Sequence, residues 1–357
     1  MKATRFESSS ALGVESIRVE TIYRLLFSEL KYIQSMINTS FAGLKLVSPI
    51  IVGSNSQTAN IQKIVELEQA GAGAIVLKSL FEESIMREIA QLGTDDHPEA
   101  YDYLSGYVSE KVVADYLALI AEAKKRCAIP IIPSIACHSD GKWEEFAKRV
   151  QDAGADAIEL NVMSISTSRL YNDGDFERLH YRIVENVVKL VNIPVIVKIG
   201  SNHSNITSLC DGLYARGAKA VVLFNRLFPT DIDIDRLTFT IGQALTSSAD
   251  LSLPLRWTGI VSASVPQVDI AVSGGVDSWK GVAKAILSGA KAVEVASAII
   301  REGASWITNA NQSLEEWQQS KGFNAPENYR GKMNAADPEN EDKLLRTQFL
   351  KYFSEIH

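Results

Sequence analysis

The chain has 357 residues, 46% of them hydrophobic and 22% charged, which is the composition of a folded globular protein with a large core. Its net charge of −7 argues against a nucleic-acid partner bound through phosphate contacts. The three cysteines are scattered, which indicates no disulfide framework. No apolar run approaches the roughly 20 residues of a membrane span. The sequence shows no signal-peptide pattern, so a cytoplasmic location is expected.

Residues 1–37 differ from the rest and are predicted to be an N-terminal extension. A polar start leads into apolar residues at three- and four-residue spacing, which predicts an amphipathic helix: Val19, Ile22, Leu26, Leu30, Ile33 and Ile37. We interpret this helix as packed on the following domain. A loose segment upstream of Met36 and an anchor on a membrane surface are the alternatives.

Residues 38–308 carry a repeating pattern of apolar strands and helices. A short hairpin with its turn at Ala42–Gly43 comes first, and strands are predicted at 50–52, 74–78, 131–135, 157–161, 195–199, 220–224, 268–272 and 292–296. Helices are predicted between them at 58–70, 110–126, 143–153, 176–191 and 206–216. Continuous apolar strands that alternate with helices indicate a parallel sheet covered on both faces. Eight of them predict a (β/α)8 TIM barrel, with an open doubly wound sheet as the alternative.

Two long connections, 79–108 and 225–255, follow the second and sixth predicted strands. Such loops lie at the catalytic end of a barrel and are expected to be lids or binding elements. Within the second loop, Asp231, Asp233 and Asp235 alternate with isoleucines, which predicts a strand with one solvated face and not a metal site. The remaining residues, 309–357, are predicted to be a polar, partly helical and solvated tail.

A phosphate-binding cradle is predicted at the ends of the last two strands. Gly274 and Gly275 follow the strand at 268–272, and Ala296 and Ser297 follow the strand at 292–296. Glycines at such a point let backbone N–H groups close on an anion, and the next helix adds the positive end of its dipole.

Polar residues also close several other strands. Lys78 and Lys198 each end an apolar run, and a buried lysine is costly without a partner, so they suggest an anionic ligand. Asn161 and Asn225 end the fourth and sixth strands. His138 and His203 follow the third and fifth strands, and we expect surface or structural roles for both.

Five fragments in this order resemble the dihydroorotate dehydrogenases, which are flavin-containing barrels: VLKS (76–79), AIELN (157–161), PVIVK (194–198), VLFN (222–225) and SGGV (273–276). The hairpin with the first strand, and WTGIVS at 257–262, are similar as well. The resemblance spans about residues 38–305. It implies an FMN cofactor and oxidation of dihydroorotate to orotate by hydride transfer to flavin, a step of pyrimidine biosynthesis. It also implies a small-molecule substrate, an electron acceptor that the sequence does not identify, and a homodimer.

The resemblance further implies a role for each matching residue. Lys198 would lie near the N1–C2 edge of the flavin ring, where a cation stabilises the anionic reduced ring. Asn161 and Asn225 would bind the substrate, and Ser164, three residues after Asn161, would be the catalytic base. The flavin contacts would come from Gly53, Ser54, Lys78, Ser79, Asn161, Gly259, Ser262, Gly274, Gly275, Ala296 and Ser297.

The substrate side departs from the family's pattern. Ile165–Ser166 stand where the family has Pro–Asn, and the loop after the second strand runs SLFEESIMREIA in place of an Asn-x-x-Gly clamp. Two alternatives therefore accompany the dehydrogenase interpretation. One is a flavin-binding protein without dihydroorotate dehydrogenase activity, and the other is an aldolase that forms a Schiff base through one of the lysines.

Overall fold

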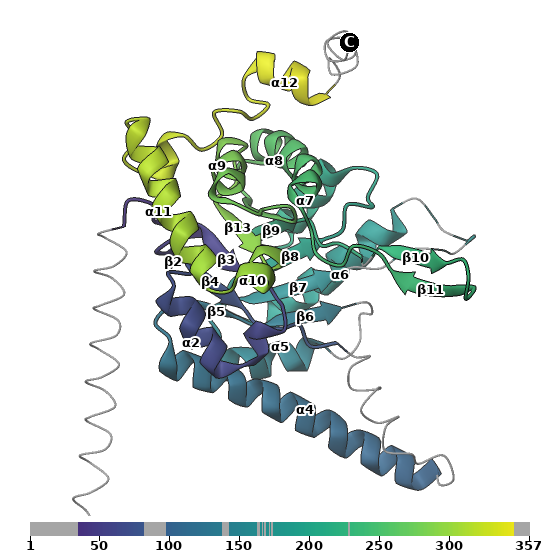
Figure 1. Ribbon diagram of the computed structural model, residues 1–357. Coiled ribbons are helices and arrows are strands. Elements are labelled where there is room, and N and C mark those ends of the chain that lie inside the picture. Colours follow the sequence, from purple (N-terminus) through teal and green to yellow (C-terminus); the bar gives the residue numbers. More distant parts are fainter. Residues whose placement is uncertain are drawn as a thin grey trace, which may run out of the picture.

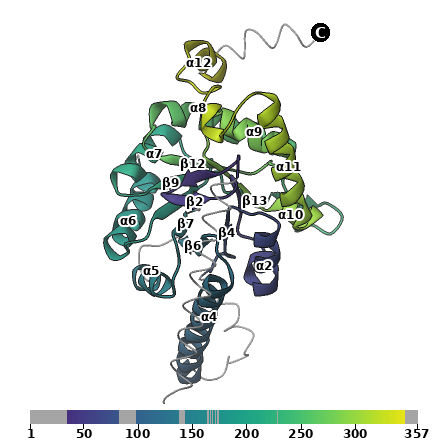
Figure 2. The ribbon, with the colours of Figure 1, turned by 90° about the vertical axis from the view of Figure 1, so that its left-hand side faces the viewer.

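The computed structural model describes residues 35–81, 98–137 and 143–345, apart from residues 163, 164, 166, 168, 171, 173 and 228. Its centre is a parallel barrel surrounded by helices (Figure 1, Figure 2). The strands are β3 (Ile50–Val52), β4 (Ala74–Val76), β5 (Ile131–Ile132), β6 (Ser134–Cys137), β7 (Ile158–Val162), β8 (Val195–Ile199), β9 (Ala220–Leu223), β12 (Asp269–Ser273) and β13 (Ala292–Val295).

The barrel closes because β5 and β6 are two halves of one strand. They are separated by Pro133 alone; β5 pairs with β4, and β6 pairs with β7 on the other side. All neighbouring strands of the barrel are parallel, and between β5 and β6 their order is β4-β3-β13-β12-β9-β8-β7. The eight predicted strands and the (β/α)8 TIM barrel are confirmed, and the open sheet is excluded.

The helices cover the outside of the barrel: α2 (Ile61–Gln69), α4 (Pro98–Arg126), α5 (Trp143–Asp152), α6 (Asp175–Leu190), α7 (Ile206–Ala215), α8 (Ser252–Ser264), α9 (Trp279–Leu287), α10 (Ser297–Glu302), α11 (Ser305–Ser320) and α12 (Pro338–Leu345). Local capping fixes some of their ends; the Asn60 side chain, for example, accepts hydrogen bonds from the first turn of α2. Helix α4 begins at Pro98, so the loop predicted over 79–108 is wrong in its last part. Among the helices of the described ranges, none combines the length and the apolar character needed to cross a bilayer.

The N-terminal end of the barrel is sealed by the predicted hairpin, formed by β1 (Thr39–Phe41) and β2 (Leu44–Leu46). Phe41 and Leu46 are buried against the apolar residues that fill the barrel at this end. The backbone N–H of Ala42, in the turn, donates to the carboxylate of Asp269 at the start of β12, at 2.9 Å. The open end of the barrel is therefore the one at which its strands terminate.

Part of the predicted tail belongs to the packed body. Helix α11 crosses residue 309, and Asn311 donates to the carbonyl of Gly71 while accepting from Ser48. Farther on, Tyr329 is completely buried and packs against the rings of Trp317 and Phe323. The solvated tail predicted from residue 309 is thus wrong as far as Tyr329. The helix predicted before Met36 lies outside the described residues.

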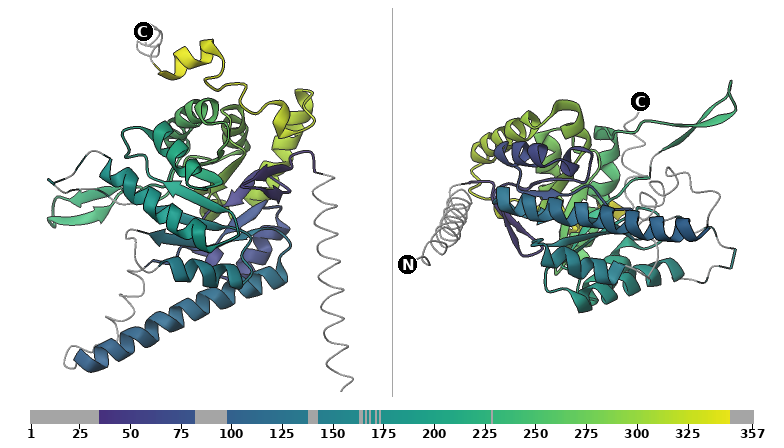
Figure 3. Two further views of the ribbon diagram at one scale, coloured as in Figure 1. Left: turned by 180° about the vertical axis from the view of Figure 1, so that it is seen from behind. Right: turned by 90° about the horizontal axis from the view of Figure 1, so that it is seen from below.

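The second long connection contains a hairpin that projects from the barrel (Figure 1, Figure 3). Its strands, β10 (Thr230–Asp233) and β11 (Thr238–Ile241), pair only with each other in the described structure. The strand predicted from the alternating aspartates is confirmed for Asp231 and Asp233, whereas Asp235 lies in the turn. The single solvated face predicted for this strand is not confirmed, because Ile232 and Phe239 are 57% and 81% exposed.

Candidate active site

Four strands place polar side chains inside the barrel, one layer above the apolar filling. Successive inward-facing residues of a strand are two apart, and on these strands an apolar residue of the filling is followed two positions later by a polar one. The pairs are Ile132 and Ser134, Ala157 and Glu159, Ile196 and Lys198, and Ala292 and Glu294. All four polar residues are buried. The barrel therefore holds two carboxyl groups, one ammonium and one hydroxyl near its open end.

Lys198 and Glu294 form an ion pair across the barrel. They lie on β8 and β13, which are separated by β9 and β12, and the Lys198 ammonium donates to Oε2 of Glu294. Their side chains are only 10% and 2% exposed. On the neighbouring strand β7, Glu159 accepts a hydrogen bond from the Ser134 hydroxyl at 3.0 Å. Its other oxygen, Oε2, is buried and receives no hydrogen bond from the described part of the chain.

The two carboxyl groups are driven to different protonation states. Burial raises the pKa of Glu159 well above its usual range, and the neighbouring Glu294 carboxylate raises it further. For Glu294, burial also favours the neutral form, but the Lys198 ammonium and a hydrogen bond from Glu159 outweigh it and lower its pKa. We therefore assign Glu159 as the neutral acid and Glu294 as the carboxylate.

Lys198 stays protonated in this setting. Burial alone would lower its pKa, but the Glu294 carboxylate, to which the ammonium donates, outweighs burial, and the pKa is raised. The anionic ligand suggested by Lys198 is not needed as its partner, because Glu294 of the chain itself supplies the counter-charge. Lys78, by contrast, is exposed at the end of β4, and only its backbone N–H has a hydrogen bond among the described residues, to Thr58.

Seven of the predicted site residues line one recess of about 170 Å³ at the ends of the strands: Ser54, Lys198, Asn225, Gly274, Gly275, Ala296 and Ser297. Further predicted residues adjoin these. The Ser79 hydroxyl shares a hydrogen bond with Ser54 at 3.1 Å, and Asn225 donates to the side-chain oxygen of Asn161 at 2.7 Å. Gly53, beside Ser54, donates its N–H to the carbonyl of Val295. The structure thus brings together both predicted flavin and predicted substrate residues.

The glycine pair has the properties of an anion cradle. Both glycines have positive φ, +92° and +77°, and within the described ranges neither N–H donates to a protein acceptor. A Cβ added to Gly274 would meet open space, whereas one added to Gly275 would lie 2.3 Å from the backbone nitrogen of Leu251. Gly274 therefore faces the space where a phosphate would fit, and Gly275 allows the segment before α8 to pack closely.

Thr246 also contributes to the cradle, although the sequence did not indicate it. Its N–H and hydroxyl both donate to the Ser297 hydroxyl, each at 3.0 Å. Nearby, the Arg226 guanidinium contacts Asp250 at 3.2 Å and the carbonyl of Gln243. The connection after β9 therefore folds back over the recess and supplies part of its wall.

Gly259 and Ser262 were predicted to contact flavin, and the structure places them elsewhere. A Cβ on Gly259 would meet Leu344 at 2.9 Å. The Ser262 hydroxyl donates to the carbonyl of Ser288 at 3.0 Å and accepts from Asn334. Both residues lie on α8 and face the C-terminal segment, so their assignment to the flavin site is wrong.

The hydrogen bonds of the Ser262 hydroxyl give a testable prediction. The Ser262→Ala variant should bind FMN with an affinity within about twofold of the unchanged protein, because the hydroxyl is bonded outside the recess. It should lose about 1 kcal/mol of unfolding free energy, the usual cost of a hydrogen bond to a part-buried carbonyl. Fluorescence titration with FMN and urea unfolding measure the two quantities. A large loss of FMN affinity without a loss of stability would return Ser262 to the site.

Three further candidates remain, and the structure describes one of them. Ser164 and His138 lie outside the described residues. His203 is buried, stacks on Phe176 with ring centroids 4.7 Å apart, and lies 3.4 Å from a carboxylate oxygen of Glu177. Burial lowers its pKa, so the predicted structural role of His203 fits its surroundings.

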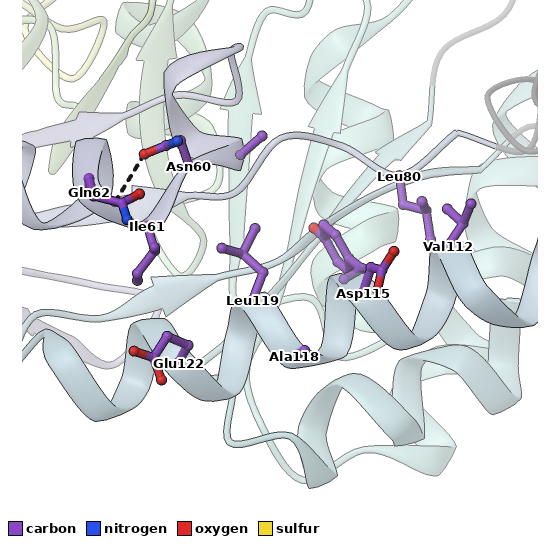
Figure 4. Close-up of a pocket in the computed structure, with 11 residues that line it drawn as sticks. Asn60, Ile61, Gln62, Leu80, Val112, Asp115, Ala118, Leu119 and Glu122 are labelled. Atoms are coloured by element: carbon purple, nitrogen blue, oxygen red, sulfur yellow. Dashed lines mark hydrogen bonds between the residues drawn. The ribbon is translucent and has the colours of Figure 1, made fainter.

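A larger groove of about 530 Å³ lies between the start of α2 and helix α4 (Figure 4). Its lining is mostly apolar, including Leu80, Val112 and Leu119, with Asp115 and Glu122 along α4. It contains none of the predicted site residues. The polar chemistry of the barrel is concentrated in the smaller recess.

Glu159 and Glu294 were not predicted as site residues, although the sequence carries a signal for them. Each stands inside an otherwise apolar strand, in AIELN and AVEVA. A charged residue in a doubly buried strand is costly unless it is paired, and the inward positions of one barrel meet. Attention to acidic residues within strands, as well as at their ends, would have found both.

Comparison with known proteins finds relatives over most of the chain. The family described as "Dihydroorotate dehydrogenase" matches residues 107–317. A putative dihydroorotate dehydrogenase A (fumarate) from Aeropyrum pernix is 26% identical over 309 residues, which cover 82% of this chain and 95% of the relative. The catalytic subunit of dihydroorotate dehydrogenase B (NAD(+)) from Thermoplasma volcanium is 25% identical over 301 residues, or 81% and 95% of the two chains. The corresponding subunit from Methanosarcina mazei is 25% identical over 305 residues, or 81% and 93%.

Proposed function

Because the chain belongs to the dihydroorotate dehydrogenase family, we propose that it is an FMN-dependent oxidoreductase that oxidises dihydroorotate, or a closely related small substrate, to orotate. One observation carries the proposal. The glycine pair, the ends of β3 and β13, Lys198 and Asn225 converge on a single recess at the open end of the barrel. This is where barrel enzymes bind phosphates and carry out chemistry.

The residues of the recess suit FMN. The backbone N–H groups of Gly274 and Gly275 would hold the phosphate, with the hydroxyls of Ser297 and Thr246 beside it. The recess is smaller than the 300–1,000 Å³ typical of small-molecule and cofactor sites, so it would hold part of the molecule. Bound flavin would supply the acceptor for hydride.

The chain's own groups would then bind and orient the substrate. Asn225 donates to Asn161, and its side-chain oxygen accepts from the backbone N–H of Arg226. This coupling fixes both amides at the end of the barrel, where they would contact the ring edge and carboxylate of the substrate. Ser164 is the residue we propose as the base that removes the substrate proton.

The protonation state of Lys198 disfavours the aldolase alternative. A Schiff base forms by attack of a neutral amine on a carbonyl. The Glu294 carboxylate keeps Lys198 charged and raises its pKa. Lys198 is therefore a poor nucleophile.

The proposed cradle can be tested by comparing FMN with riboflavin, which lacks the phosphate. We expect one FMN to bind per chain, and riboflavin to bind at least about 100-fold more weakly, because charge-assisted hydrogen bonds to the phosphate contribute roughly 1.5–3 kcal/mol each. Quenching of flavin fluorescence during titration of cofactor-free protein measures both affinities. Equal affinities would remove the phosphate cradle from the proposal.

A further inference from the structure

The charge of Lys198 is already neutralised by the protein. Lys198 lines the recess, and its ammonium is bonded to Glu294, which lines the same recess. Glu159, on the strand beside Lys198, is 1% exposed and adds a second carboxyl group. These three ionisable groups share the polar layer of the barrel.

Burial favours one protonation state of these three groups, the one in which their charges sum to zero. With both carboxyl groups ionised the layer would carry a net charge of −1 without solvent to stabilise it. With one proton retained, the layer is neutral. A protonated Glu159 Oε2 can donate to the Glu294 carboxylate, whereas an ionised one would be a buried oxygen with no donor in the described structure.

We propose that Glu294, with Glu159 as a neutral acid beside it, cancels the charge of Lys198, so that the polar layer of the barrel presents no net cation to the flavin. This inference rests on the proposed function. Hydride transfer adds two electrons and one proton, so the reduced ring is an anion unless a second proton joins it. A compensated Lys198 stabilises that anion weakly, and the reduction potential of the bound flavin is lower than a free Lys198 would set.

Two variants separate a compensated cation from a free one. Lys198→Met leaves Glu294 unpaired, whereas Lys198→Met with Glu294→Gln removes both members of the ion pair and keeps similar volume. At a pH high enough to ionise Glu294 in the single variant, we expect that variant to lower the flavin midpoint potential by at least about 30 mV, a tenfold change in relative affinity for a two-electron couple. The double variant should return the midpoint potential to within about 15 mV of that of the unchanged protein, which is a threefold change in relative affinity. A double variant as low as the single one would show that Lys198 acts as a free cation and overturn the proposal.

A matched control lies at the opposite end of the barrel. Asp269 forms a part-buried ion pair with Lys291 at 2.7 Å, far from the recess along the same barrel. Asp269→Asn removes a carboxylate from an ion pair without touching the site. Its flavin potential should not move; a shift as large as that of Lys198→Met would mean that general loosening of the barrel causes both effects.

The proton on Glu159 can be tested without any cofactor. Infrared spectra of the cofactor-free protein should contain the carbonyl band of a protonated carboxylic acid at pH 7, and Glu159→Gln should remove it. Absence of that band from the unchanged protein would overturn the neutral layer. A protein that shows the band yet binds no FMN would instead sink the proposed function and leave the charge pairing intact.

Discussion

Replacing Gly274 with aspartate is expected to weaken FMN binding by at least about 100-fold while the barrel remains folded. A Cβ at this position meets open space, so the side chain fits sterically and enters the cradle. There its carboxylate would repel the phosphate, and it would accept the hydrogen bonds of the N–H groups that should hold the phosphate. The two effects together should cost more than the roughly 2.7 kcal/mol that corresponds to a 100-fold loss of affinity. Flavin content after purification and titration with FMN measure the effect.

Gly274→Ala separates charge from backbone strain. The φ of +92° disfavours any L side chain, so alanine should cost about 1 kcal/mol of stability. Without a carboxylate it should keep FMN affinity within about tenfold. If aspartate and alanine weaken FMN binding equally, or if the aspartate variant keeps full flavin content, the phosphate does not bind at Gly274.

Replacing Lys198 with methionine is expected to destabilise the folded chain by roughly 3–5 kcal/mol near neutral pH, the cost of leaving a buried charge without its partner. The Lys198 ammonium lowers the pKa of Glu294 and holds it ionised inside the barrel. Without the ammonium, burial controls, and the Glu294 pKa rises above its value in the unfolded chain. Urea unfolding at several pH values measures the loss.

The pH dependence has a definite sign. With Lys198 present, the folded pKa of Glu294 is lowered, so its stabilising contribution is present above the unfolded pKa and is lost as pH falls. With methionine, the folded pKa is raised, so the carboxyl is tolerated at low pH and becomes destabilising as pH rises. The difference between the two proteins should therefore be larger at pH 8 than at pH 5. Adding Glu294→Gln should restore most of the stability at pH 8; failure to do so would contradict the ion pair.

The barrel could be predicted because its strands carry a strong local signal. Runs such as Ile50–Val52 and Ala220–Leu223 are fully apolar, and both faces of a parallel barrel strand are buried. The start of α4 was missed because Gly106 lies in its interior, where glycine is about 1 kcal/mol less favourable than alanine. The packing of α11 was missed because its sequence is polar: half-buried Asn311 and buried Gln318 are held by specific hydrogen bonds.

The structure brings the predicted site residues together where strand ends determine their position, and separates them where a helix does. Gly274, Ser297 and Lys198 follow or close strands, and parallel strands end at the same rim. Ser262 belongs to a helix, where only the packing of the C-terminal segment decides which side faces the barrel. The partner of Lys198 was missed because Glu294 is 96 positions away and meets it only when the barrel closes.

The most direct test of the proposed function is an anaerobic visible spectrum of the FMN-loaded protein, recorded before and after addition of dihydroorotate. The proposed function predicts a flavin absorption band that bleaches with dihydroorotate as hydride reaches the flavin. A band that persists would keep FMN in the recess and contradict oxidation of dihydroorotate. Absence of a flavin band after FMN has been supplied would contradict the cofactor itself.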